Sequence, residues 1–199
     1  LDLIKNNGHA IIEKEANQDI LDCLGVTYQI ISNVEGLSCY SSFTGIPFGE
    51  NLGGKDYKDI LTKNRSAFIN SQVKRRLIYG IYVSSSDNFD KIYIKAKKIR
   101  TLLINLANDL LDGVDCLLIP SSSCIAPKID DALNNRCKST HADDALDLAN
   151  FAGLPSITIP AGKYNNMPYG ININCKQFKD QDVLNIAYTI EDILGGNNE

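Results

Sequence analysis

The sequence predicts an α/β fold in which helices cover a mixed β-sheet. Three runs of residues, 114–119, 156–159 and 171–174, have the composition of short strands. Amphipathic patterns of helical spacing separate them, and helices of this kind pack their apolar side on a sheet. A length of 199 residues, 44% of them hydrophobic, is enough for a domain with its own core.

The first third of the chain is predicted to be mainly helical. Residues 1–14 predict a short helix, a turn at Asn-Gly and a strand, and residues 16–24 have a helical pattern. Apolar residues at helical spacing predict a helix over 26–42 and another over 57–68. The paired glycines at 53–54 indicate a loop between these two helices.

The middle of the chain predicts one long helix followed by a buried strand. Apolar residues keep a three-and-four spacing over 89–111. Ser86 or Asp87 is expected to cap this helix, because the side-chain oxygens of both can accept hydrogen bonds from free backbone amides. Residues 114–119 are apolar on both faces, which is typical of an interior strand.

Another helix should lead directly into a strand. Residues 142–151 have a helical pattern that ends at Gly153. The Gly-Leu-Pro sequence there supplies a left-handed terminator and then a residue that cannot continue a helix. A strand is predicted over 156–159, and Pro160 is expected to close it.

The C-terminal part predicts a loop, a strand and a last helix. Residues 161–170 contain two glycines, two asparagines and a proline, which indicates a loop before the strand at 171–174. An apolar stripe over 182–193 predicts a helix. Residues 195–199 are expected to be a disordered tail, which leaves 1–194 as the folded portion.

Composition argues against several classes of protein. With 20 basic and 24 acidic residues, the chain has no general electrostatic footprint for nucleic acid. Its six cysteines include no Cys-x-x-Cys pair, and two histidines offer little help in holding a metal, so reduced thiols are expected. The absence of an apolar run of about 18 residues predicts no membrane segment, and we expect a cytoplasmic location.

Polar clusters have alternative interpretations on sequence alone. The serines at 84–86 and 121–123 lack the glycines of a nucleophile elbow, and neither histidine has a recognisable base spacing to the second cluster. The basic triplet Lys74–Arg76 is typical of a solvated helix face or a weak anion site. His141 precedes an acidic helix and fits a surface or capping role.

Three stretches carry motifs of a known family. The C-terminal motif comprises Asn150, Ala152, Gly153, Leu154, Pro155, Ile159, Pro160, Pro168, Gly170 and Asn172. The central motif comprises Arg65, Ser66, Val73, Lys74, Arg75, Arg76, Gly80, Ser84 and Ser85, followed by a Lys- and Ala-containing helix over 93–102. These motifs resemble the amidase signature family, most closely its amidotransferase A subunits.

A third stretch, residues 34–50, also resembles the family but departs from it in a loop. Glu35, Gly45 and Gly49 match. The family's usual Tyr, Asp, Arg and Tyr are replaced at Phe43, Thr44, Pro47 and Phe48. In the family this loop lies near the substrate, so the replacements remove polar groups there.

The resemblance implies that residues 1–194 form the C-terminal half of an amidase signature domain. Family members cleave amides with a Ser nucleophile, a second Ser and a Lys, which belong to a Gly/Ser-rich signature and an upstream Lys that are absent here. We therefore expect this chain alone to be inactive. Half of a sheet should also expose an apolar edge and favour self-association.

The same resemblance implies a role in tRNA-dependent amidation. The complete subunit would release ammonia from glutamine, and Glu-tRNA(Gln) would become Gln-tRNA(Gln). Its expected partners are B and C subunits. ATP, Mg and most tRNA contacts are expected in the partner subunit, with no cofactor in this chain. The alternatives are a non-catalytic binding or assembly module on the same fold, or an amidase for another small amide.

The resemblance also assigns candidate site residues. Arg76 is expected to bind the carboxylate of glutamine, because guanidinium offers a planar two-donor fork, and Asp143 its ammonium. On sequence alone Asp143 is as readily one more solvated carboxylate. Ser121, Ser122 and Gly153 are candidates for the wall of the pocket.

Overall fold

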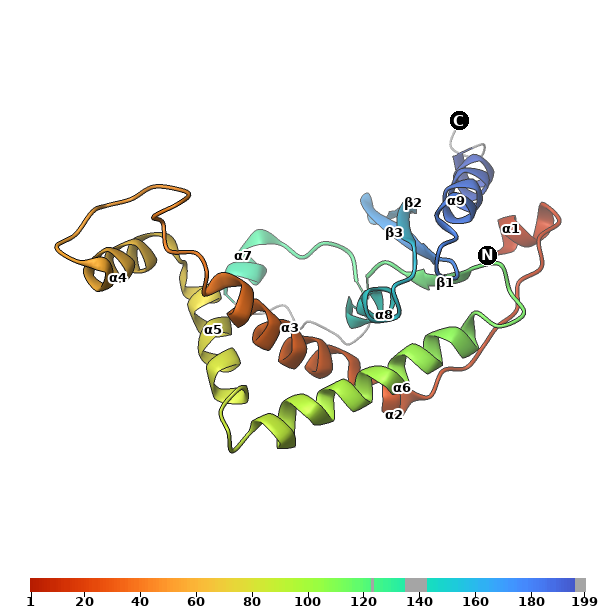
Figure 1. Ribbon diagram of the computed structural model, residues 1–199. Coiled ribbons are helices and arrows are strands. Elements are labelled where there is room, and N and C mark those ends of the chain that lie inside the picture. Colours follow the sequence, from red (N-terminus) through yellow and green to blue (C-terminus); the bar gives the residue numbers. More distant parts are fainter. Residues whose placement is uncertain (123, 135–142, 196–199) are drawn as a thin grey trace. The chain divides into compact units, whose positions relative to one another are not determined.

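The structure is a computed structural model that describes residues 1–122, 124–134 and 143–195 (Figure 1). It divides the chain into two compact units. One unit comprises Leu1–Gly25 with Arg100–Glu199, and the other comprises Val26–Ile99.

The unit of residues 26–99 is helical, and the helices predicted over 26–42 and 57–68 are both present. It contains most of α3 (Leu24–Tyr40), then α4 (Tyr57–Phe68) and α5 (Ser71–Val83). The side chains of Asp56 and Asn70 accept hydrogen bonds from backbone amides in the first turns of α4 and α5, and these caps fix where both helices start.

The long central helix begins differently from the prediction. Its first turn is a π-helix, η1 (Phe89–Ile94), which continues as α6 (Lys95–Leu110). The preceding residue is Asn88, and its side chain makes no capping hydrogen bond. The predicted cap at Ser86 or Asp87 is wrong, because the Ser85 carbonyl instead accepts from the backbone amides of Asn88 and Phe89, at 3.0 and 2.9 Å.

The N-terminal segment is less regular than predicted. It forms the short helices α1 (Asp2–Asn6) and α2 (Gln18–Leu21), but the strand expected before residue 14 does not form among the described residues. Residues 9–17 instead run as an irregular segment. The Lys14 ammonium donates to the carbonyls of Asp109 and Asp112, so this segment is tied to the C-terminal end of α6.

Among the residues that the structure describes, the sheet has three antiparallel strands in the order β1-β3-β2. They are β1 (Leu117–Pro120), β2 (Ser156–Tyr164) and β3 (Met167–Asn174). The predicted α/β class is confirmed, although all described strand pairs are antiparallel rather than mixed. β3 is the central strand, so the predicted interior strand at 114–119 lies at an edge of this sheet.

The predicted loop at 161–170 is instead the end of a β-hairpin, made of the last residues of β2, a turn at 165–166 and the first residues of β3. Asn165 and Asn166 have φ angles of 49° and 64°, and two consecutive residues of positive φ form the turn that suits the twist of paired strands. Pro160 does not end β2, because it pairs with Gly170 on an edge strand, where a missing amide is tolerated. A register shift between Pro160 and Gly162 then bends the hairpin.

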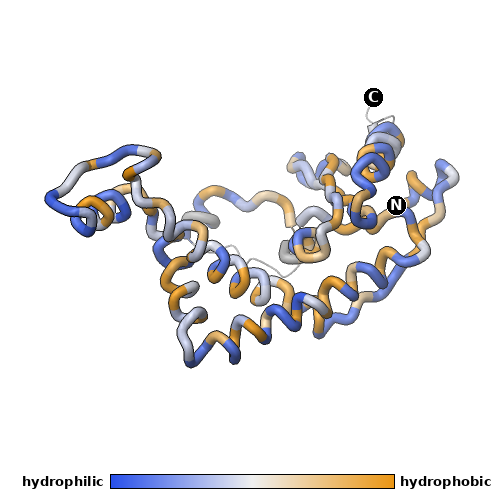
Figure 2. Tube along the Cα trace, in the orientation of Figure 1, coloured by the Kyte–Doolittle hydropathy of each residue, from blue (hydrophilic) through white to orange (hydrophobic). Residues whose placement is uncertain are grey.

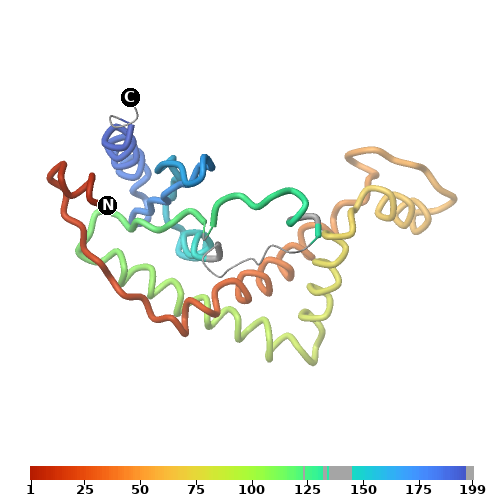
Figure 3. Tube along the Cα trace, turned by 180° about the vertical axis from the view of Figure 1, so that it is seen from behind, coloured from red at the N-terminus to blue at the C-terminus, as the bar shows by residue number. Residues whose placement is uncertain are grey.

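One apolar cluster of this unit lies on one face of the sheet. Ile159 and Ile173 point to that face and pack with buried residues of α9 (Asp180–Gly195), which are Val183, Ala187 and Ile190. α1 lies beside α9 in both opposite views (Figures 1 and 3) and adds the buried Ile4 to the cluster. Figure 2 shows apolar and polar residues alternating around α6 and α9, as expected for helices with one packed side.

In the described parts of the connection between β1 and the hairpin, the short helices are α7 (Ile129–Leu133), η2 (Asp143–Leu146) and α8 (Asp147–Ala152). The predicted helix end at Gly153 is confirmed. Gly153 has a φ of 64° and ψ of 38°, the left-handed conformation that glycine adopts without strain. The helix α9 extends through Gly195, and the rest of the predicted tail, like His141, lies outside the described residues.

Candidate functional site

On the second face of the sheet, β2 and β3 present polar side chains and β1 presents Leu117 and Ile119, and we call it the amide face. Because side chains alternate along a strand, register places Asn172 and Asn174 of β3 beside Thr158 and Ser156 of β2. Asn172 and Asn174 are only 3% and 2% exposed, whereas the β2 side chains are open to solvent. The amide face therefore has buried amides on its central strand and an accessible polar rim on β2.

Hydrogen bonds connect the amide face into one network. The Asn172 Nδ2 group donates to Thr158 Oγ1 at 2.9 Å and to Ser156 Oγ at 3.0 Å. Asn174 Nδ2 donates to Asn172 Oδ1 at 2.8 Å. The Asn174 Oδ1 atom is buried and has no hydrogen-bond partner among the described residues. The network is thus complete around Asn172 and incomplete at Asn174.

The predicted wall residue Ser121 lies at the end of this face. Its backbone amide donates to the Gly170 carbonyl at 3.2 Å, which continues the β1–β3 pairing by one residue. A Cβ atom at Gly170 would stand 2.9 Å from Ser121 Oγ and 3.0 Å from the Ile159 carbonyl. Gly170 is therefore required for the close approach of the Ser121 loop to the hairpin.

The other two candidate wall residues have local structural roles. Ser122 Oγ accepts a weak hydrogen bond from the Cys124 amide at 3.4 Å. Gly153 ends α8, and Gln177 reaches across to donate to the neighbouring Ala152 carbonyl. That Ser121, Ser122 and Gly153 wall a substrate pocket stays a prediction.

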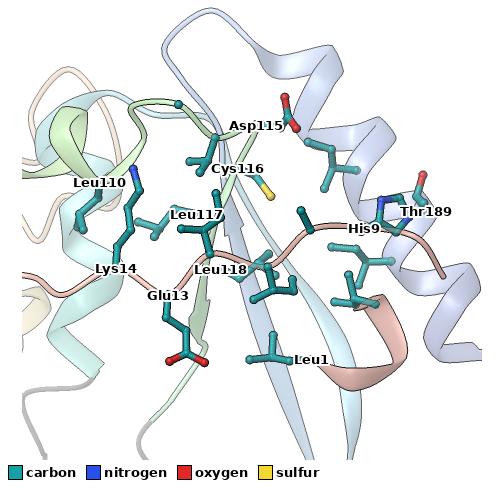
Figure 4. A pocket seen from close by; sticks show the side chains of 18 of the residues that line it. Leu1, His9, Glu13, Lys14, Leu110, Asp115, Cys116, Leu117, Leu118 and Thr189 are labelled. Carbon is teal, nitrogen blue, oxygen red and sulfur yellow. The ribbon is translucent and has the colours of Figure 1, made fainter. Parts of the chain in front are cut away.

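A cavity of about 820 Å³ lies elsewhere in the same unit (Figure 4). It is bounded by residues 9–15, residues 113–118 and one side of α9. None of the three candidate wall residues lines it. His9, one of the two histidines of the chain, does line it, together with Glu13.

The two residues predicted to bind glutamine belong to different units. Arg76 is exposed on α5, next to the exposed Arg75. Asp143 is the first residue of η2, in the unit that holds the sheet. The exposure of Arg76 suits a residue that meets a ligand and also suits a solvated helix face. The pairing of Arg76 with Asp143 stays a prediction.

The loop that departs from the family pattern is held by two side chains of α4. Asn64, 2% exposed, accepts from the Leu52 amide at 3.0 Å and donates to the Thr44 carbonyl at 3.1 Å. Arg65 Nη2 donates to the Ser41 carbonyl at 2.6 Å. Phe48, 86% exposed, is therefore presented on a loop of fixed backbone.

The first serine cluster serves a helix end. Ser85 Oγ donates to the Tyr82 carbonyl at 2.8 Å and accepts from Asn88 Nδ2 at 3.1 Å. Asn88 Nδ2 also donates to the Tyr82 carbonyl at 3.1 Å, so both side chains satisfy a carbonyl at the C-terminus of α5. Within the described ranges, no cluster of three or more His, Cys, Asp or Glu side chains is arranged to hold a metal ion. The helices described also include none long and apolar enough to cross a bilayer.

Comparison with known proteins shows the family of the chain. The model of the Amidase family matches residues 1–184. The chain belongs to this amidase family. The glutamyl-tRNA(Gln) amidotransferase A subunit of Mycoplasma genitalium is 35% identical over 201 residues, which cover 98% of this chain and 42% of that protein. The protein of the same name from Pelagibacter ubique is 36% identical over 175 residues, covering 87% of this chain and 36% of that protein.

Solved structures agree on the fold of this amidase-family chain. The urea amidolyase of Kluyveromyces lactis matches with a TM-score of 0.70 and 18% identity, over 100% of this chain and 11% of that one. A crystal structure described as an amidase matches with a TM-score of 0.65 and 22% identity, over 88% of this chain and 36% of that one. The chain spans about two fifths of the length of the curated relatives it matches.

The sequence interpretation missed most of the amide face. The amide of Asn172 belongs to the family motif, but Asn174, Ser156 and Thr158 were not singled out. The signal was the alternation in Gly-Ile-Asn-Ile-Asn over 170–174, which puts both amides on one side of a strand. Recognising the network also required the register with β2, which a predicted loop at 161–170 concealed.

Proposed function

We propose that this chain is the substrate-side part of the A subunit of a glutamyl-tRNA(Gln) amidotransferase. The observation that carries the proposal is the similarity, at 31–36% identity, to proteins of that name from eight bacteria and archaea. In this proposal the complete subunit hydrolyses the side-chain amide of glutamine. The ammonia then amidates Glu-tRNA(Gln).

The partners follow from the same proposal. B and C subunits complete the assembly, and the partner subunit holds ATP, Mg and most of the tRNA. A net charge of −4 supports this division, because a chain that neutralised many phosphates itself would be expected to be basic overall. A cytoplasmic location is consistent with this role in translation.

Glutamine recognition is assigned to Arg76 and Asp143. Arg76 would bind the α-carboxylate through two parallel N–H groups, and Asp143 would bind the α-ammonium. The exposed guanidinium of Arg76 supports this role. Ser121, Ser122 and Gly153 are assigned to the wall of the pocket, and Ser121 is anchored to Gly170 at the end of the amide face.

The chain alone is proposed to be inactive, because it lacks the Ser-Ser-Lys set of the family. Ser85, whose hydroxyl is committed to the end of α5, does not supply a substitute. Ammonia release from glutamine by the purified chain measures this directly. Turnover above the uncatalysed rate that disappears in Ser85→Ala or Ser122→Ala would contradict it.

The decisive experiment joins this chain to the part of the Mycoplasma genitalium relative that it does not span. The joined subunit is supplied with partner subunits, ATP, Mg and Glu-tRNA(Gln), and glutamine-dependent amidation is measured. Arg76→Ala or Asp143→Ala should weaken glutamine use by about 1.5–3 kcal/mol each, the value of a charged hydrogen bond. Arg75→Ala and Asp147→Ala are the matched controls and should change little.

Each outcome separates the alternatives. Normal glutamine use by both site variants would remove the assignment of Arg76 and Asp143 but leave the amidotransferase proposal intact. Hydrolysis of another small amide without use of glutamine would favour the alternative that the complete protein is an amidase for that other amide. A joined subunit that binds its partners and hydrolyses no amide would favour a binding or assembly module.

A further inference from the structure

Two of the cysteines are brought together by the register of the sheet. Leu117 pairs with Asn174 at the end of the β1–β3 ladder. Cys116 comes directly before Leu117, and Cys175 comes directly after Asn174. Continuing the antiparallel register by one residue therefore places Cys116 opposite Cys175.

Packing independently places both cysteines on the same face. Cys175, 1% exposed, belongs to the buried cluster under α9, and the half-buried Cys116 packs against that cluster. Directly opposed residues of antiparallel strands have Cα atoms about 4.5 or 5.5 Å apart. Both values fall inside the range of about 4.4–6.8 Å that a disulfide bond spans.

Access to this pair is provided by the cavity. Cys116 lines it, and Figure 4 shows the Cys116 sulfur among the lining side chains between β1 and α9. Cys175 does not line the cavity. The two thiols are thus unequal: a small reagent in the cavity meets Cys116 first, and Cys175 lies behind it.

We propose that Cys116 and Cys175 are a modification site, a cross-strand dithiol that a low-molecular-weight disulfide converts to an intramolecular disulfide bond. The Cys116 thiolate attacks one sulfur of the reagent RSSR, forms a mixed disulfide and releases one RS⁻. The Cys175 thiolate then attacks Cys116 Sγ, forms the Cys116–Cys175 bond and releases the second RS⁻. The two thiol protons end on the two RSH products, so the protein is oxidised by two electrons and the reagent is reduced by two.

The surroundings of the thiols set the conditions for this reaction. Burial raises the pKa of Cys116, and the neighbouring Asp115 carboxylate raises it further. The pKa of Cys175 is raised to about 11, mainly by burial and further by the charges of Cys116, Asp182 of α9 and Asp115. The cavity also presents His9, Glu13, Lys14 and Glu15 from the N-terminal segment. Because thiolates are the attacking species, oxidation should speed up as pH rises from 7 to 9.

The test treats the reduced full chain with oxidised glutathione at pH 8.5, followed by alkylation and peptide mapping. Two of the six thiols should be lost from alkylation, and one linked pair of peptides should contain Cys116 and Cys175. Because the bond closes a long loop, the thermal midpoint should rise by about 5–10 °C and return on reduction.

Cysteine variants separate the two exchange steps. Cys175→Ala should stop at the mixed disulfide, so that glutathione accumulates on Cys116. Cys116→Ser should leave Cys175 unmodified in the folded chain. Cys39→Ser, which removes an exposed thiol, is the matched control and should form the linked pair normally. Stable glutathione on Cys116 of the unsubstituted chain, or linkage only after denaturant is added, would overturn the proposal.

Discussion

The two faces of the three-stranded sheet are built from alternate residues of the same strands, yet they differ in what holds them together. On one face Ile159, Ile173 and Cys175 pack under α9 in a continuous apolar cluster. On the amide face, Asn172 and Asn174 are as deeply buried but are joined by directional hydrogen bonds. A one-residue shift of register would exchange the two faces, so this contrast fixes the register of the hairpin.

The contrast also indicates which face is available for chemistry. The apolar cluster under α9 serves stability and meets small reagents at Cys116 through the cavity, whereas buried amides beside an accessible Ser and Thr rim offer hydrogen-bond donors and acceptors at fixed positions. The Ser121 loop, anchored to Gly170, lies at the end of the polar side. We therefore expect substitutions on the apolar face to act on folding, and those near the Ser121 end of the amide face to act on function as well.

The largest effect is expected on the apolar face. Ile173→Ala removes a side chain that is fully buried at the centre of the sheet and should cost about 2–5 kcal/mol of unfolding free energy. Urea unfolding followed by circular dichroism measures the change. Ile78→Ala, on an isoleucine of α5 that is 67% exposed, should cost far less. Equal losses in the two variants would mean that the cluster under α9 is not the core of its unit.

The next effect concerns the centre of the amide face. Asn172→Ala removes the donor to Ser156 and Thr158 and leaves the buried Asn174 Nδ2 without its acceptor. The exposed Ser and Thr hydroxyls can hydrogen-bond to water instead. The expected loss of unfolding free energy is therefore about 2 kcal/mol, mainly because the buried Asn174 amide has lost its acceptor. Thr158→Val removes only one rim hydroxyl and should cost about 1 kcal/mol or less. A loss at Thr158 as large as that at Asn172 would show that the network has no central residue.

Sequence reasoning succeeded where a local signal fixed the structure. The helix predicted at 57–68 has those same bounds, because the Asp56 cap and the apolar spacing agree on its start. The end of α8 was equally clear from Gly153. Sequence reasoning failed where the structure depends on pairing: the Asn165–Asn166 turn reads as a loop until two strands are known to meet there. Both the amide face and the Cys116–Cys175 pair follow from strand register.

A smaller effect should appear as a dependence of the unfolding free energy on pH. The pKa of Cys175 is about 11 in the folded chain, above the ordinary thiol value, so the unfolded chain loses this proton at lower pH. The stabilising contribution is therefore complete below about pH 9 and is lost as pH rises toward 11, by at most about 1.4 kcal/mol per pH unit for one thiol. Urea unfolding of the reduced chain at a series of pH values measures the slope. Cys175→Ala should flatten it, and an unchanged slope would assign the dependence to other groups.

The smallest effect separates the two amides of the same face. Asn174 Oδ1 is buried and finds no partner in the described part of the chain, so the folded protein already bears the cost of desolvating that oxygen. Asn174→Val removes this cost and adds apolar contact, but it also removes the 2.8 Å hydrogen bond to Asn172 Oδ1. Ser156 Oγ still donates to that acceptor at 3.3 Å, so little is left unsatisfied. The two contributions should cancel to within about 1 kcal/mol, in contrast to Asn172→Ala. A loss of about 3 kcal/mol at Asn174 would show instead that its oxygen binds an ordered group, such as a buried water, that stabilises the amide face.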